Sequence, residues 1–231
     1  MSVSWPFSAP AEMLNTKVNI EAELMLEGMS LEQKVGQMIQ PDIRYITPAE
    51  LSKYHIGTVL SGGGAPPNEN VYADTAEWLR MADEFYDASL KSGAPLPCAW
   101  GIDAVHGHNN LFCATLFPHN IGLGATRNPE LARKIAEATA IEVAATGLDW
   151  TFAPALAVTM DDRWGRTYES YSESVDLVRE FTAPVIEGLQ GKLSDEDFLT
   201  GPHIWATAKH YLGDGGTHGG VDQGDTLCDE V

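Results

Sequence analysis

The chain has 231 residues, of which 33 are Asp or Glu and only 14 are Lys or Arg, so its formal net charge is −19. A surface this acidic repels phosphate backbones and anionic headgroups, so we expect neither nucleic acid nor a membrane as a partner. A neutral substrate suits this charge better. The length allows one large domain or two small ones.

The termini, cysteines and histidines carry little chemical signal. Residues 1–18 predict an irregular surface arm, because prolines interrupt them and no basic segment precedes an apolar one. The compartment is therefore open: periplasmic or secreted if a leader was removed, and cytoplasmic otherwise. We expect no metal and no other cofactor, because neither the three cysteines nor the histidines have spacings typical of metal sites.

The predicted elements alternate between helices and strands along the chain. We expect helices over residues 20–28, 30–40, 48–54, 71–91, 128–146 and 172–190, and strands over residues 57–60, 97–102, 149–153 and 204–209. Residues 38–40 are an alternative short strand. This alternation predicts a parallel α/β architecture with four or five strands.

Capping signals mark several predicted helix ends. Ser30 followed by Gln33 has the spacing of a capping box. Asn128 followed by Pro129 is typical of a helix N-terminus, and Gly147 of a helix C-terminus.

Charged residues follow the apolar runs of the predicted strands. Asp103 comes directly after one run, Arg166 follows the next, and Lys209 and His210 end the last. Because the carboxyl ends of parallel strands meet on one face, as in (β/α) barrels, we expect these four side chains to converge on one pocket.

Four segments, in order along the chain, resemble glycoside hydrolase family 3. They are residues 30–38, 101–107, 162–171 and 208–211, and the third includes an Arg-Trp-Gly-Arg motif. Residues 118–124 and 219–226 are most similar to bacterial exo-1,3/1,4-β-glucanase members. The resemblance implies a (β/α)8 TIM-barrel fold that is incomplete here, with about the first five β/α units. Residues 1–231 would be part of the N-terminal barrel domain, with the C-terminal α/β sandwich domain absent.

The resemblance also implies an activity and a set of site residues. The activity is retaining exo-hydrolysis of non-reducing terminal β-D-glucosyl residues from β-glucans or oligosaccharides. Asp103, Arg166, Lys209 and His210 match the family residues that bind the sugar before the scissile bond. A carboxylate accepts hydrogen bonds from hydroxyl groups, and Arg and Lys donate charge-assisted hydrogen bonds to sugar oxygens.

The family's two catalytic carboxyl groups match no position in this sequence. The family nucleophile is an aspartate on a later barrel strand, and the acid/base is a glutamate from the second domain. The aspartates of the last segment, at 214, 222, 225 and 229, lie in or after the loop that follows His210 and are no substitutes. We therefore expect the isolated chain to bind a sugar without hydrolysing it, and to self-associate through its incomplete barrel.

Two alternatives stay open. One is a β-N-acetylglucosaminidase of the same family, whose members carry a catalytic His-Asp pair in the loop after the Lys-His dipeptide. Leu212 and Asp214 stand in that loop in place of a proline and a histidine, which disfavours this activity. The other alternative is a non-catalytic sugar-binding fragment.

Overall fold

The computed structural model describes residues 16–227. The predicted arm at 1–18 therefore lies almost wholly outside the described residues, as do Cys228 and Asp229. The helices are α1 (Thr16–Gly28), α2 (Leu31–Gln37), α3 (Pro48–Lys53), α4 (Thr75–Leu90), α5 (Asn120–Ala125), α6 (Pro129–Ala144) and α7 (Val175–Gln190), and the strands are β1 (Thr58–Ser61), β2 (Ala99–Ile102) and β3 (Trp150–Thr151). Within residues 16–227, none of these helices is long and apolar enough to cross a membrane.

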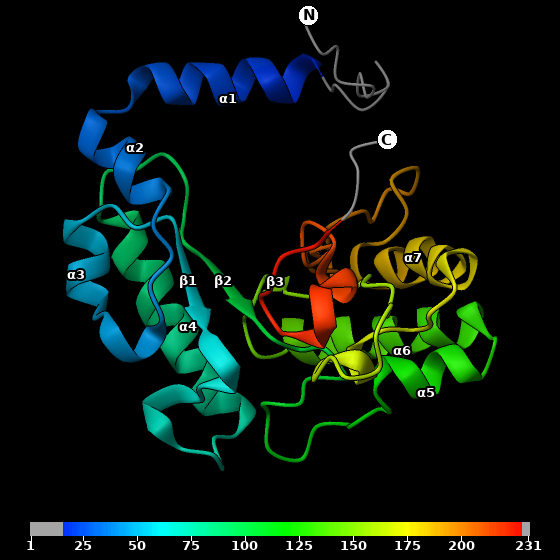
Figure 1. The fold of residues 1–231 in the computed structure, drawn as a ribbon. Helices are drawn as coiled ribbons and strands as arrows, with labels where there is room; N and C mark the ends of the chain where they lie inside the picture. Colours follow the sequence, from blue (N-terminus) through cyan, green and yellow to red (C-terminus); the bar gives the residue numbers. More distant parts are fainter. Residues whose placement is uncertain (1–15, 228–231) are drawn as a thin grey trace, which may run out of the picture.

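The strands form a parallel sheet in the order β1-β2-β3 (Figure 1). Single parallel bridges extend this order at both edges, from Asp42 to Leu60 of β1 and from Trp205 to Trp150 of β3. The first bridge lies close to the alternative strand at 38–40. The prediction of an α/β fold with a parallel sheet is thus confirmed.

The predicted strand at 204–209 is wrong as a continuous strand. Trp205 is hydrogen-bonded to the chain on either side of Trp150, but Thr207 then donates to the Ala153 carbonyl and Lys209 to the Pro154 carbonyl. The parallel bridges Trp150–Trp205 and Ala155–Lys209 are five residues apart on one segment and four on the other, so the ladder shifts by one residue, as at a β-bulge. The segment still runs parallel to residues 149–156, so Lys209 reaches the carboxyl edge of the sheet.

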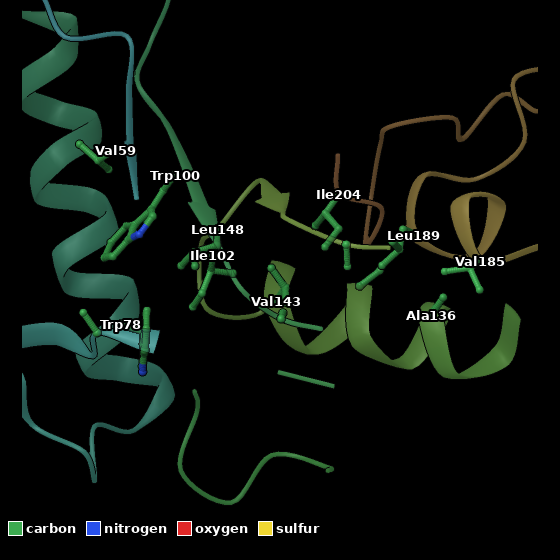
Figure 2. Close-up of a cluster of buried hydrophobic side chains, with 14 of the residues drawn as sticks. Val59, Trp78, Trp100, Ile102, Ala136, Val143, Leu148, Val185, Leu189 and Ile204 are labelled. Atoms are coloured by element: carbon green, nitrogen blue, oxygen red, sulfur yellow. The ribbon is translucent and has the colours of Figure 1, made fainter. Parts of the chain in front are cut away.

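The sheet is buried between two groups of helices. Trp78 of α4 packs against Trp100 of β2, with ring centroids 5.8 Å apart, and Val59 lies beside them (Figure 2). Leu189 of α7 and Ile204 lie together over α6 on the other side of the cluster. All four residues of β2 are buried, as is typical of a strand covered on both faces.

The predicted caps of α2 and α6 are present, and α7 has an N-cap as well. Ser30 accepts a hydrogen bond from the Gln33 backbone while the Gln33 side chain accepts one from Ser30, which completes the capping box. Asn128 and Ser174 cap α6 and α7 in the same way, each accepting a hydrogen bond from the backbone three residues on.

Helix α5 was not predicted, because Gly122 and Gly124 give it a low intrinsic helix propensity. The absence of a side chain at Gly124 is required by the packing of α5. A Cβ atom at this position would collide with the backbone carbonyl of Tyr171. The glycine therefore lets α5 lie directly against the segment that follows the Arg-Trp-Gly-Arg motif.

We expect Gly124→Ala to destabilise the chain by about 2 kcal/mol, because overpacking against a backbone carbonyl forces the two segments apart. The matched control is Gly122→Ala in the same helix, where the nearest atom to an added Cβ is the Pro118 Cβ at 3.4 Å. The control should be neutral or stabilising by up to about 1 kcal/mol, through helix propensity alone. Urea unfolding measures both, and equal effects would contradict this account of the α5 contact.

We expect the isolated chain to self-associate or to be poorly soluble. Leu24, Leu31 and Met38 on and beside α1 and α2 are 63%, 72% and 87% exposed, and no strand among residues 16–227 pairs with the outer side of segment 204–209. Backbone pairing and burial of apolar side chains favour association at contact. Repulsion between the negative charges opposes it, but this repulsion is screened beyond about 8 Å at physiological salt. Sedimentation velocity decides the question, and a stable, cooperatively unfolding monomer would contradict the expectation.

Candidate functional site

A cavity of 380 Å³ opens at the carboxyl end of the sheet. Four residues that line this cavity come after strands or bridges of the sheet. Gly63 follows β1, Asp103 follows β2, Ala155 follows β3, and Lys209 follows the bridge at Trp205. The parallel direction of the strands is what brings these positions together.

Lys209 and Asp103 form an ion pair within the cavity, although 106 residues separate them in the sequence. The Lys209 ammonium lies 3.0 Å from the Asp103 carboxylate, and the lysine side chain is only 13% exposed. The Lys209 backbone is held on both sides, since its N–H donates to Pro154 and its carbonyl accepts from Leu156. The cation is therefore positioned by the backbone as well as by its partner.

Arg166 forms a two-bond ion pair with Glu169, three residues further on. Arg166 Nε and Nη2 donate to the two Glu169 carboxylate oxygens at 2.7 and 2.8 Å. Burial by itself would raise the pKa of Glu169, but the hydrogen bonds and charge of Arg166 hold it below its ordinary value. The same hydrogen bonds raise the pKa of Arg166. Both groups are therefore ionised at neutral pH.

His210 lies against Arg166 rather than in the lining of the cavity. Its Nε2 is 2.9 Å from Arg166 Nη2, and its Nδ1 is 2.6 Å from an Asp214 carboxylate oxygen. Its ring faces an adjoining cavity of 370 Å³, which Lys209 also lines. The structure thus brings all four predicted residues together, but three of them line the sugar-sized cavity and the fourth contacts one of the three.

The cavity contains residues that the sequence did not single out as site residues. Besides Glu169, they include His119 and Tyr168, whose rings meet edge to face with centroids 4.6 Å apart. The His106 ring also meets the His119 ring, with centroids 3.9 Å apart, and burial together with this neighbour lowers the pKa of His106. The spacing of three residues between Arg166 and Glu169 was a visible signal. His119 lies in segment 118–124, which contributes to the family resemblance, but no feature of that segment marked it as a site residue.

The chemistry of this cavity suits a neutral ligand with many hydroxyl groups. Ion-paired carboxylates offer acceptors, the ammonium and guanidinium offer donors, and the rings of His106, His119 and Tyr168 form a wall. Within residues 16–227, His, Cys, Asp and Glu side chains form no group of three that could hold a metal ion.

Fold and cavity together define an α/β protein with a polar binding site at the carboxyl ends of parallel strands. Residues 30–230 match the family model described as the glycosyl hydrolase family 3 N terminal domain. The chain therefore belongs to glycoside hydrolase family 3 and is β-glucosidase-like.

Several relatives are similar over most of the chain. A lysosomal β-glucosidase of Dictyostelium discoideum is 32% identical over 82% of this chain, which covers 25% of that protein. An exo-1,3/1,4-β-glucanase structure from a Pseudoalteromonas species is 50% identical over 99% of this chain, with a TM-score of 0.89, and 29% of it is covered. A family 3 β-N-acetylglucosaminidase from a Paenibacillus species, at 23% identity and a TM-score of 0.70, shares the fold. This chain thus spans a quarter to a third of these proteins' length.

Glu169→Gln should destabilise the chain near neutral pH by about 1–2 kcal/mol, because it removes one partner of a partly buried, hydrogen-bonded ion pair. The pKa of Glu169 is lowered by folding, so its contribution is present above the unfolded pKa and is lost as the pH falls through the folded value. The difference between wild type and variant should therefore shrink below about pH 4.

Thermal unfolding of both proteins at neutral and acid pH measures this difference. The control is Glu130→Gln on α6, which removes an exposed carboxylate partner of Arg133 and leaves its second partner, Glu137, in place. It should change the unfolding midpoint much less at every pH, because exposed ion pairs contribute little. A Glu169→Gln effect that does not depend on pH would show that the carboxylate charge is unimportant.

Proposed function

We propose that the 380 Å³ cavity binds the non-reducing terminal β-D-glucosyl unit of a β-glucan or oligosaccharide, as part of a retaining exo-acting β-glucosidase. The observation that carries this proposal is the pairing of Asp103 with Lys209 beside Arg166 with Glu169 in one cavity. The similarity to an exo-1,3/1,4-β-glucanase at 50% identity supports a glucan substrate. In this proposal residues 1–231 form about the first five β/α units of a (β/α)8 barrel.

In this proposal the cavity residues hold one sugar ring in place. Asp103 accepts hydrogen bonds from sugar hydroxyl groups on the side that does not face Lys209. Lys209 and Arg166 donate to ring and hydroxyl oxygens. Several fixed, charge-assisted hydrogen bonds restrict the pose of the ring, and correct positioning is a large part of glycosidase catalysis.

We propose further that the two reacting carboxyl groups lie outside these 231 residues, on a later barrel strand and in a C-terminal α/β sandwich domain. A retaining glycosidase needs two carboxyl groups about 5–5.5 Å apart, and its proton donor has a raised pKa. The two cavity carboxylates do not meet this description. Asp103 is paired with Lys209, and the pKa of Glu169 is lowered rather than raised.

The 231-residue chain should therefore bind methyl β-D-glucoside but release no aglycone from an aryl β-glucoside. Isothermal titration measures binding, and absorbance of the released phenol measures hydrolysis. Lys209→Met should weaken binding about tenfold or more, because it removes a charged hydrogen-bond donor. The control is Lys134→Met on α6, an exposed lysine outside the cavity, which should bind like wild type.

Two results would contradict the proposal. Turnover of the aryl glucoside by the pure chain would mean that the reacting carboxyl groups are among the described ones. Equal loss of binding in the Lys209 and Lys134 variants would place the sugar elsewhere. Tighter binding of N-acetylglucosamine than of glucose would favour the acetylglucosaminidase alternative.

A further inference from the structure

Four side chains form an unbroken chain of hydrogen bonds along one wall of the cavity. Glu169 binds Arg166, Arg166 binds His210, and His210 binds Asp214. The two ends are carboxylates and the middle is a cation next to an imidazole. Only Arg166 and Glu169 line the 380 Å³ cavity, so the other two act from behind it.

The direction of these hydrogen bonds determines the protonation of His210. A guanidinium has only N–H donors and stays charged at all relevant pH values. At 2.9 Å from Arg166 Nη2, His210 Nε2 must therefore present its lone pair. The ring proton then lies on Nδ1, which donates to the Asp214 carboxylate oxygen at 2.6 Å. The histidine is neutral, in the Nδ1–H tautomer.

This arrangement leaves one nitrogen of Arg166 for a ligand. Nε and one N–H of Nη2 are bound to Glu169, and the second N–H of Nη2 is bound to His210. Among residues 16–227, Nη1 has no hydrogen-bond partner. Both ring nitrogens of His210 have protein partners, Asp214 and Arg166, so its contacts hold the guanidinium.

The position of Asp214 is itself set by the backbone. Asp214 begins a short turn whose next residue, Gly215, accepts a hydrogen bond from Met160 N–H at 2.9 Å. A Cβ atom at Gly215 would collide with the Val158 carbonyl, so the two loops touch at this point. The Asp214 side chain is only 15% exposed.

We propose that Asp214 is a positioning residue of the sugar site. It keeps the His210 proton on Nδ1, so that Nε2 remains an acceptor and holds Arg166 with Nη1 toward the cavity. His210, which is predicted to bind the sugar, also orients the arginine beside it. That the ligand is a sugar rests on the proposed function. The tautomer of His210 and its contact with Arg166 do not depend on that function.

The ring state of His210 can be read without any sugar. In the ¹⁵N-labelled chain near neutral pH, long-range proton–nitrogen spectra distinguish the two neutral tautomers and the imidazolium, and His210→Gln assigns the signals. We expect a protonated Nδ1 and an unprotonated Nε2. Asp214→Ala should abolish this preference, whereas Asp225→Ala, which removes an exposed carboxylate of the same segment, should preserve it.

A proton on His210 Nε2 in the wild-type chain would overturn the proposal, whatever the variants do. This part of the test therefore stands even if Asp214→Ala fails to fold. If the ring state is as expected and the chain binds no sugar, the proposed function fails while the positioning of Arg166 remains.

A double-mutant cycle tests whether Asp214 acts through His210. Asp214→Ala should weaken binding of methyl β-D-glucoside about tenfold, and Asp214→Asn less, because the amide oxygen can still accept the Nδ1 proton. In a His210→Gln background the further change Asp214→Ala should have little additional effect, since residues in one network are not additive. Fully additive losses would show that Asp214 acts by another route.

Discussion

Parallel pairing of a few short strands is the constraint on which the site depends. Because β1, β2 and β3 run in the same direction, the residues that follow them emerge on one edge. The bridge at Trp205 adds the segment that ends in Lys209. The ion pair from Lys209 to Asp103 then crosses from that segment to the end of β2 and ties the edge together.

Charge is compensated within the cavity even though the chain as a whole is strongly acidic. Each cation in it contacts a carboxylate, and each carboxylate is held by a cation. Taking an unpaired charge out of water costs several kcal/mol, so pairing is what permits this many charges in one partly buried place. The same pairing keeps the pKa of Glu169 low and makes the cavity better suited to holding a sugar than to protonating one.

Local features of the chain were readable from the sequence. The capping box at Ser30 and the Asn128 cap use contacts three residues apart, and short-range spacing is enough to predict them. Helix α5 was missed because its two glycines oppose helix formation, and only the close approach to Tyr171 explains one of them. The strand at 204–209 was overestimated, because its register against residues 150–155 shifts by one residue, and one segment alone does not show how its partner pairs with it.

The sequence by itself determined the alternation of helices and strands, the motifs that carry the family resemblance, and the four side chains that meet at the carboxyl edge. These follow from apolar periodicity and from residue types at strand ends, which are properties of single segments. Only the tertiary structure decided that His210 contacts Arg166 as well as Asp214. Arg166 is 44 residues away from His210 in the sequence, and no local pattern contains this information.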